Sequence, residues 1–452
     1  MAVFGLVLGA ASIARPLPGQ IPPRRMILTS AAANPSAPVS ARPGGVPPRL
    51  AADRADDLAD GTALPTDTRS VRIEREGEVI RTAPDGQSPR RGTAARGTRL
   101  PALEATQGRD CQGFWVRIGT DAWVCSDGVD LSADPPQAVP LPTVHDGDVV
   151  PYQYAFATHA GVRTYRRLED VSTDDWADEL ERGMSVAVVG TARVDGGTYV
   201  HTASGRWVSL RDLSWAQPSE RAGLFYDPDE AVDAAGFLRV DVRAWPTPEA
   251  AVRDRGVARG TVELTRRDGV HVRETRVLHG WTVVRLDGGW VPAAHLLRPA
   301  VPPPPADLAP GERWVDVDRT RQVMVAFEGT RPVFATLVST GRPGSPTAPG
   351  EHRVWAKLAT TDMSNVDDTD IDTAAALYTV SRVPWVMFFH NDQALHGAFW
   401  HDAFGHSHSH GCVNLAPRDA AWLYAWSPPA MPPGWTAVLP TAREPGLRVR
   451  VR

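Results

Sequence analysis

A chain of 452 residues is too long for one core of ordinary size, so we expect two to four domains. Its shares of hydrophobic residues (42%) and charged residues (22%) are ordinary for folded proteins, which excludes a chain disordered throughout. The net charge of -5 is not gathered into runs of one sign, and no stretch is as long and apolar as a membrane-spanning helix. We therefore expect no nucleic-acid partner and no integral membrane protein.

Residues 1–68 are predicted to precede the folded domains. The short apolar run from Ala2 to Ala14 ends in Ser12-Ile13-Ala14, with small residues at the two positions that a signal peptidase reads, although no basic segment precedes it. The residues that follow are rich in Pro, Ala, Arg, Gly and Ser without apolar periodicity, which is typical of a flexible tether. We expect a degraded or mis-started export signal, and hence a protein of the periplasm or cell envelope.

Two of the three cysteines, Cys111 and Cys125, flank a predicted pair of short strands, Trp115 to Ile118 and Trp123-Val124, joined by a Gly-Thr-Asp turn. A disulfide between them is plausible; it would add about 3 kcal/mol in the chain-entropy model and would suit an oxidising compartment. Two buried thiols are the alternative. Cys412 is the odd cysteine, and an unpaired cysteine in an exported protein is either accidental or reactive.

A weak repeat runs through the middle of the chain. Trp-Val pairs recur at nearly equal intervals, each with an Arg-Gly pair upstream, and the stretches between them alternate apolar and polar residues. The pairs are Trp123-Val124, Trp207-Val208 and Trp290-Val291, preceded by Arg96-Gly97, Arg182-Gly183 and Arg259-Gly260. This pattern predicts three small β-barrels, at residues 69–135, 149–216 and 235–299, because closing a sheet removes its exposed edges. The middle copy inserts a helical-looking stretch, Asp174 to Arg182.

These three segments resemble bacterial SH3-like domains through their Arg-Gly and Trp-Val positions. The resemblance implies binding to cell-wall peptides, and barrels that act only as spacers are the alternative. Residues 300–310, which contain four consecutive prolines, are predicted to form a stiff linker before the last domain.

Residues 311–441 are predicted to form this last domain, which opens with a β-meander. The expected strands are Trp314 to Val317, Gln322 to Phe327, Pro332 to Ser339, His352 to Ala356 and Val383 to His390. We therefore expect a mainly β protein in which small barrels precede a C-terminal β-sandwich or barrel.

Cysteine and histidine are concentrated only near the end of this domain, in His396-Gly397 and Ser409-His410-Gly411-Cys412-Val413-Asn414. A cysteine is mostly thiol at neutral pH, so an imidazole must take its proton before the sulfur attacks a carbonyl. If Ser409 to Val413 is extended, the side chains of His410 and Cys412 point to the same face. The backbone amides of Gly411 and Cys412 could then donate to an oxyanion.

The SHGCVN segment after an upstream HG resembles the signature of the L,D-transpeptidase (YkuD-like) catalytic domain. Ser339-Thr340-Gly341 and Thr347-Ala348-Pro349-Gly350 look like the STG and TPxG turns of that family. The resemblance implies that Cys412 is the acylated nucleophile and His396 its general base, with the carbonyl of Gly397 orienting the imidazole. His410 and Gly411 would complete the catalytic site, and Ser409 and Asn414 would contact substrate.

The resemblance further implies a substrate, a peptidoglycan tetrapeptide stem attacked at the carbonyl before its terminal D-alanine. The thioester would pass to the side-chain amine of a neighbouring stem, giving a 3-3 crosslink. Transfer to water would make the protein an L,D-carboxypeptidase, and transfer to a protein amine would make it an attachment enzyme. No cofactor is required, and a carbapenem is expected to acylate Cys412.

Three other interpretations remain open. The residues His390, His396, His401, Asp402, His406, His408 and His410 could hold zinc or copper, although a metal would not account for Cys412. Cys412 could be a small buried hydrophobe, or the chain could be a wall-binding protein without catalysis. NlpC/P60-like peptidases are the competing enzyme family, but they place the cysteine ahead of the histidine.

Overall fold

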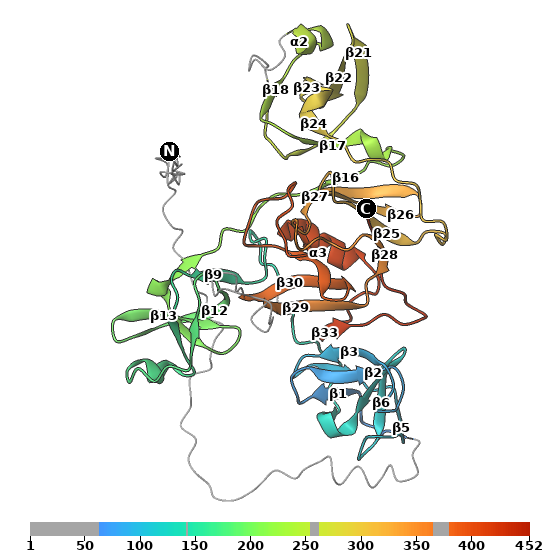
Figure 1. The fold of residues 1–452 in the computed structure, drawn as a ribbon. Coiled ribbons are helices and arrows are strands. Elements are labelled where there is room, and N and C mark those ends of the chain that lie inside the picture. The colour runs from blue at the N-terminus through green and yellow to red at the C-terminus, as the bar shows by residue number, and fades with distance from the viewer. Residues whose placement is uncertain (1–62, 142, 254–261, 365–378) are drawn as a thin grey trace, which may run out of the picture. The chain divides into compact units, whose positions relative to one another are not determined.

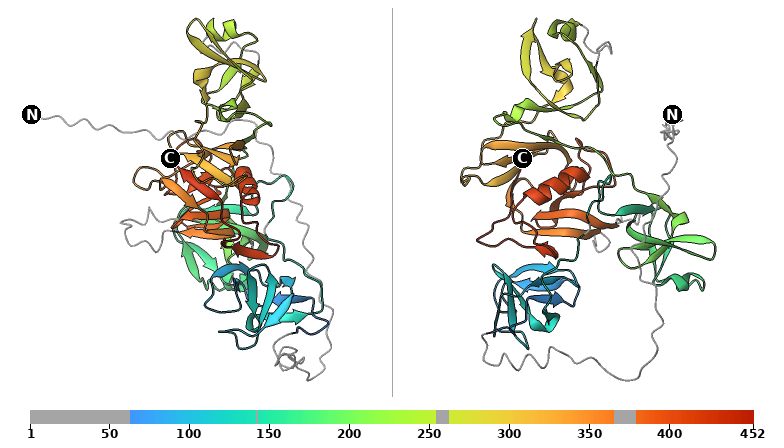
Figure 2. Two further views of the ribbon diagram at one scale, coloured as in Figure 1. Left: turned by 90° about the vertical axis from the view of Figure 1, so that its right-hand side faces the viewer. Right: turned by 180° about the vertical axis from the view of Figure 1, so that it is seen from behind.

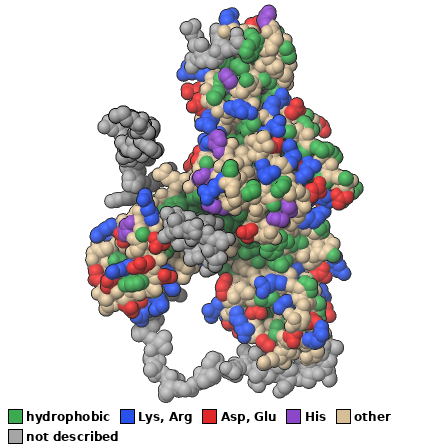
Figure 3. Space-filling view, in the orientation of Figure 1, with side chains coloured by type: hydrophobic (Ala, Val, Ile, Leu, Met, Phe, Trp, Pro, Cys, Tyr) green, Lys and Arg blue, Asp and Glu red, His purple; other side chains and the backbone are tan. Residues whose placement is uncertain are grey.

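The computed structural model describes residues 63–141, 143–253, 262–364 and 379–452, and the expectations for residues 1–62 and for Arg259-Gly260 lie outside them. The described part of the chain is mainly β, as expected (Figure 1). Neither of its α-helices has both the length and the apolar character needed to cross a bilayer. On the face that Figure 3 shows, basic and acidic side chains are interspersed.

The first group of strands covers residues 70–132, and its core is built on the fully buried side chains of Ile80, Val116 and Val124. The predicted hairpin and disulfide are confirmed: strands β6 and β7 pair, and Cys111 is bonded to Cys125 with their Cα atoms 5.7 Å apart. The strands are β1 (Ser70–Ile73), β2 (Glu78–Arg81), β3 (Arg90–Ala94), β4 (Arg99–Pro101), β5 (Glu104–Thr106), β6 (Trp115–Gly119), β7 (Ala122–Cys125) and β8 (Val129–Ser132).

The second group forms one antiparallel sheet in the order β11-β10-β14-β13-β12-β9-β15. The expected helix from Asp174 to Arg182 is wrong, because Asp178 to Leu180 pair with β10 and Asp174 has a φ of 55°. The strands are β9 (Gln153–Ala157), β10 (Val162–Tyr165), β11 (Asp178–Leu180), β12 (Ser185–Val194), β13 (Gly197–Thr202), β14 (Trp207–Ser209) and β15 (Leu213–Trp215).

The third group covers residues 235–297 and packs around Trp245, Val284 and Trp290. Its elements are β17 (Ala235–Leu238), β18 (Val242–Ala244), α2 (Pro248–Arg253), β19 (Val262–Leu264), β20 (Gly269–His271), β21 (Glu274–Leu278), β22 (Trp281–Leu286), β23 (Gly289–Pro292) and β24 (Leu296–Leu297). That the three groups are SH3-like barrels stays a prediction.

A short segment before the third group belongs to the C-terminal domain. Strand β16 (Leu224–Phe225) pairs with β27, with Leu224 opposite Ala335. We call residues 219–225 the strap. Leu224 packs in a cluster with Trp314 and Phe404, so the strap contributes to the core of that domain.

The C-terminal domain is a sheet in the order β28-β34-β25-β26-β27-β32-β31-β30-β29-β33. Strands β25 and β34 are parallel, as are β31 and β32, and the other neighbours are antiparallel. The elements are β25 (Arg313–Asp318), β26 (Val323–Glu328), β27 (Arg331–Ser339), β28 (Gly350–Arg353), β29 (Ala356–Ser364), β30 (Thr379–His390), β31 (Gln393–Gly397), β32 (Val413–Leu415), α3 (Pro417–Trp426), β33 (Trp435–Val438) and β34 (Arg448–Val451).

Helix α3 covers one face of this sheet, where it contacts β30 and β31 (Figure 2). Pro417 at its first position cannot interrupt a helical hydrogen bond there, and Leu423 is buried in the core below. The expected strand from His352 to Ala356 is wrong in one respect, because it is split. Strand β28 ends at Arg353 and pairs with β34, whereas β29 begins at Ala356 and pairs with β30.

Candidate active site

The segment that carries Cys412 is a turn and not a strand, which corrects the expectation of an extended Ser409 to Val413. Residues 410–412 are bends, Gly411 has a φ of 129°, and β32 begins only at Val413. The Ser409 hydroxyl holds the turn, since it accepts from the amide of Gly411 at 3.1 Å and donates to the carbonyl of Cys412 at 2.5 Å. His410 and Cys412 are therefore not related by strand alternation. The Gly411 amide already has a partner, and the Ser409 side chain is buried in the turn that bears the sulfur.

Three motifs that lie far apart in the sequence are joined around this turn. The backbone of Arg342 donates to the carbonyl of Ser409 at 3.0 Å, and the backbone of Ser409 donates to the carbonyl of Thr340 at 3.2 Å. The Gly341 amide donates to the Thr347 hydroxyl at 2.9 Å, so the STG turn is tied both to the cysteine turn and to the TAPG turn. These bonds hold Cys412 against the end of β27.

Two glutamines that the sequence analysis missed add further hydrogen bonds to the turns around Cys412. The Gln322 carboxamide accepts from the Thr340 amide at 2.8 Å and donates to the Thr340 hydroxyl at 2.7 Å. The Gln393 carboxamide accepts from the Ala348 amide at 2.8 Å, and its nitrogen would lie 2.8 Å from a Cβ added at Gly411. No motif in the sequence distinguishes either residue from a surface glutamine.

The Cys412 sulfur lies 3.9 Å from the carbonyl oxygen of Asp392 and packs against the cluster around Ala394, with Trp400 beside it. Burial raises the pKa of the thiol to about 11, although the Ala394 amide lowers it in part. The side chain keeps some exposure to solvent, so the sulfur is half-buried and mainly protonated at neutral pH.

His396 is 1% exposed on β31, and its Nδ1 lies 3.3 Å from the carbonyl oxygen of Gly397. The Trp400 ring stacks on the imidazole at 5.6 Å between centroids. Burial lowers the pKa of His396 to about 4, and the bond to Gly397 raises it in part. The ring is therefore neutral at physiological pH, with a proton on Nδ1 if Gly397 is its acceptor, and Nε2 is then free of hydrogen and able to accept one.

His396, Asn414 and Cys412 lie on one face of the sheet at β31 and β32. Leu395 is opposite Val413, and both are buried in the core on the other face of the sheet. His396 is opposite Asn414, so these two side chains point away from that core. Ala394 lies two positions before His396 on β31, and the Cys412 side chain, in the turn before β32, packs against the cluster that contains Ala394. No hydrogen bond between the Cys412 thiol and the ring of His396 is present in the described part of the chain.

The other histidines make different contacts. The rings of His401 and His408 lie 4.6 Å apart between centroids, and those of His352 and His390 lie 4.8 Å apart. The exposed His410 ring contacts the guanidinium of Arg342, and burial together with Arg342 lowers its pKa. The His406 ring contacts Arg266 at 3.2 Å. Among the described residues, the groups of potential metal ligands that converge are Cys111 with Cys125 and Asp127, and Asp227 with Glu230 and His271. Neither group includes any of the seven residues near the cysteine.

Asn414 is 2% exposed, and its carboxamide lies 2.9 Å from Nε2 of His401, a residue that the sequence analysis considered only as a metal ligand. The amide of Ala403 donates to Nδ1 of the same ring at 3.0 Å. Asn414 is thus held on the catalytic face by an internal contact, and a direct contact with substrate stays a prediction.

The family model for the L,D-transpeptidase catalytic domain, YkuD, matches residues 312–442. A search of curated proteins finds no match. Among solved structures, an L,D-transpeptidase from Stackebrandtia nassauensis is 26% identical with a TM-score of 0.22, over 32% of this chain and 57% of that one. One from Mycobacterium smegmatis is 17% identical with a TM-score of 0.26, over 58% and 99%.

A third structure, titled as the Ldtfm-avibactam carbamoyl enzyme, is 21% identical with a TM-score of 0.24, over 31% of this chain and 49% of that one. This chain thus covers about half the length of this structure and 57% of the one from Stackebrandtia nassauensis. The family-model match is to the segment in which the STG, TAPG and SHGC motifs are joined. Residues 312–442 are thus similar to the L,D-transpeptidase (YkuD) catalytic domain.

Proposed function

We propose that this protein is a peptidoglycan L,D-transpeptidase that forms 3-3 crosslinks through a thioester on Cys412. The observation that carries the proposal is that His396 and Asn414 lie on one face of β31 and β32, with Cys412 packed against Ala394 on that face, in a turn held by the hydrogen bonds among the three motifs. It is supported by the match of residues 312–442 to the L,D-transpeptidase catalytic domain.

In the proposed reaction, the Cys412 sulfur attacks the carbonyl carbon before the terminal D-alanine of a tetrapeptide stem. The thiol proton passes to Nε2 of His396, which burial keeps unprotonated at rest. The carbon–nitrogen bond then breaks, and D-alanine leaves with the proton from the imidazolium. The amine of a second stem attacks the thioester, an amide forms, and the thiol is restored through His396.

The fixed position of the imidazole suits this role. The Gly397 carbonyl and the stacked Trp400 ring hold the plane of the His396 side chain. Gly397 itself has little room for a side chain, since an added Cβ would lie 3.0 Å from the ring of Trp385. A side chain at this position would displace Trp385 or the strand that carries the proposed base.

We also infer that the protein acts outside the cytoplasm, in the periplasm or cell envelope, because its proposed substrate is there. The disulfide between Cys111 and Cys125 would be stable in such an oxidising compartment. The three upstream groups of strands are proposed to be SH3-like modules that hold the catalytic domain near wall peptides.

The test is to incubate the purified protein with disaccharide-tetrapeptide and identify the products by mass spectrometry, with Cys412→Ala as control. Loss of D-alanine together with crosslinked dimers is expected. Tripeptide monomer alone would indicate a carboxypeptidase. Unchanged substrate, together with retention on insoluble peptidoglycan by both proteins, would indicate a wall-binding protein without catalysis. A carbapenem is expected to leave a covalent adduct on Cys412, and an adduct mapped to another residue would contradict the assignment.

A further inference from the structure

His401 lies on the loop between β31 and β32, and its ring has a defined partner at each nitrogen. The backbone amide of Ala403 donates to Nδ1 at 3.0 Å, and the Asn414 carboxamide lies 2.9 Å from Nε2. The ring is packed beside Phe404, 5.0 Å between centroids, and beside His408 at 4.6 Å. The imidazole therefore cannot rotate without losing both contacts.

These contacts fix the tautomer of His401. A backbone amide can only donate, so Nδ1 carries a lone pair and no hydrogen. Burial, and then the neighbouring His408 and His396, lower the pKa of His401 to about 3, so the ring is neutral. A neutral imidazole without hydrogen on Nδ1 has its hydrogen on Nε2. His401 is thus the donor to Asn414, and the carboxamide must present its oxygen to the ring.

This orientation determines which atom, oxygen or nitrogen, lies at the end of the Asn414 carboxamide away from His401. One terminal atom of this carboxamide is buried and has no hydrogen-bond partner among the described residues. Because the oxygen faces His401, the NH2 group takes the other place, since the two ends of an amide exchange by a 180° rotation. An oxygen in that place would be a buried acceptor without a donor, which costs about 1–3 kcal/mol, and the exchange removes this cost.

Asn414 is opposite His396 in the register of β31 and β32, and Cys412 packs against the cluster that contains Ala394, which is on the same face of β31 as His396. We propose that His401 is a positioning residue, which holds the oxygen of Asn414 so that the NH2 group is presented on the face that carries Cys412 and His396. This inference rests on the proposed function: a donor on that face would stabilise the negative charge that develops during acyl transfer.

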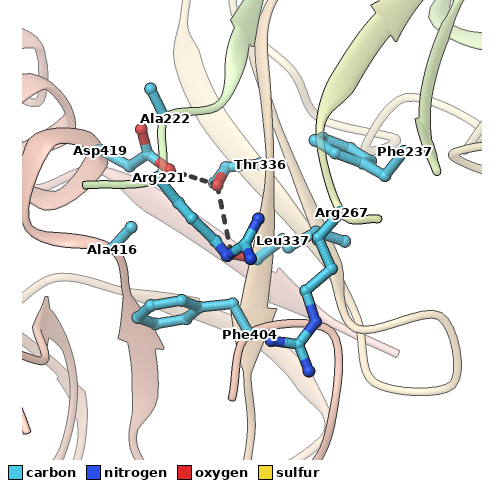
Figure 4. Close-up of a pocket in the computed structure, with 9 residues that line it drawn as sticks. All are labelled: Arg221, Ala222, Phe237, Arg267, Thr336, Leu337, Phe404, Ala416 and Asp419. Carbon is cyan, nitrogen blue, oxygen red and sulfur yellow. Dashed lines mark hydrogen bonds between the residues drawn. The ribbon is translucent and has the colours of Figure 1, made fainter. Parts of the chain in front are cut away.

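The strap holds the loop that carries His401. The Ser219 hydroxyl donates to the carboxylate of Asp402, next in sequence to His401, at 2.7 Å, and Nε of Arg221 donates to the same carboxylate at 2.8 and 3.0 Å. Figure 4 shows the Arg221 side chain lining a pocket together with Leu337 and Phe404. The strap therefore also helps to hold His401 in place, through its hydrogen bonds to the neighbouring Asp402.

Activity variants separate positioning from simple packing. In His401→Phe the ring keeps its shape but loses the donor, and we expect kcat for D-alanine release to fall on the order of 10- to 100-fold with little change in KM. His401→Gln carries an acceptor and a donor and is expected to retain most of the activity. Asn414→Asp keeps the oxygen but lacks the NH2 group, and its kcat should fall as far as that of Asn414→Ala.

The decisive measurement is a double-mutant cycle between His401→Phe and Asn414→Ala. If His401 acts through Asn414, the double variant is no slower than Asn414→Ala alone. Losses that multiply would overturn the inference, as would full activity in His401→Phe. Thermal unfolding of each variant accompanies the rates, and if His401→Phe does not fold, the comparison of His401→Gln with Asn414→Asp takes its place.

A second measurement needs no turnover. In protein labelled with 15N-histidine, the His401 signals at neutral pH are expected to show a protonated Nε2 and an unprotonated Nδ1, and the Nε2 signal should shift in Asn414→Ala. A proton on Nδ1 would overturn the inference even if the enzyme is active. Conversely, a wild-type protein that shows the expected tautomer but releases no D-alanine would refute the proposed function and leave the hydrogen bond to Asn414 established.

Discussion

The pH dependence of Cys412 alkylation tests whether its thiol is protonated at rest. Burial raises the pKa of this thiol to about 11, compared with an ordinary value of 9.0. At pH 8 this difference leaves about 100-fold less thiolate than on an ordinary cysteine. Because only the thiolate is nucleophilic, Cys412 should react with iodoacetamide about 100-fold more slowly than an exposed thiol. Its rate should keep rising tenfold per pH unit above pH 9, where the rate of an exposed thiol levels off.

The measurement is simple, because Cys111 and Cys125 are bonded to each other and leave Cys412 as the free thiol. Intact-protein mass spectrometry gives the rate, with glutathione as the exposed reference. His396→Ala is expected to change resting alkylation little but to lower turnover on the order of 10²- to 10⁴-fold. His279→Ala, which removes an exposed ring between β21 and β22, is the matched control. An alkylation rate that is already level near pH 6 would refute the reasoning, because it would reveal a preformed thiolate and imidazolium pair.

Three further predictions concern residues that stabilise the folded protein away from the reacting atoms. Burial raises the pKa of Asp419 to about 6 from 3.8, so the free energy of unfolding should fall as pH rises from 4 to 6, and Asp419→Asn should remove this fall in urea titrations. Gly341→Ala would place its Cβ 2.1 Å from the Ser345 carbonyl oxygen, which should cost about 1–3 kcal/mol and reduce turnover. Gly190→Ala, with its nearest contact at 3.9 Å, is the control and should be nearly neutral. Cys111→Ser should lower the free energy of unfolding by about 3 kcal/mol, and equal stability with and without reductant in the wild type would contradict this.

The strands of the C-terminal domain could be predicted from sequence because apolar residues stand at several consecutive or alternating positions in them. Trp314 to Val317 and Gln322 to Phe327 were predicted in this way, and β25 and β26 contain nearly these residues. The strap could not be predicted, since β16 has only Leu224 and Phe225 and is a strand only because β27 lies beside it. Short strands of this kind are set by tertiary contact and not by local pattern.

Within the site, residue types could be predicted but side-chain directions could not. The alternation argument for His410 failed because Gly411 adopts a positive φ, which a sequence pattern does not reveal. Lys357 is a feature that the sequence analysis missed, since nothing in the sequence around a single lysine indicates that its side chain is buried. It is fully buried and donates to the carbonyls of Tyr424 and Ser427, each at 2.7 Å, at the end of helix α3.

The pKa values of the two central groups limit how the reaction can begin. With the thiol near 11 and the His396 imidazole near 4, a separated thiolate and imidazolium are disfavoured at every pH. Both shifts have the same cause, because burial penalises whichever form is charged. Proton transfer must therefore accompany attack on the carbonyl, when charge moves from sulfur to the oxygen of the substrate. Donors fixed in advance on this face, such as the NH2 group of Asn414, then stabilise that charge as it appears, without a protein rearrangement at that moment.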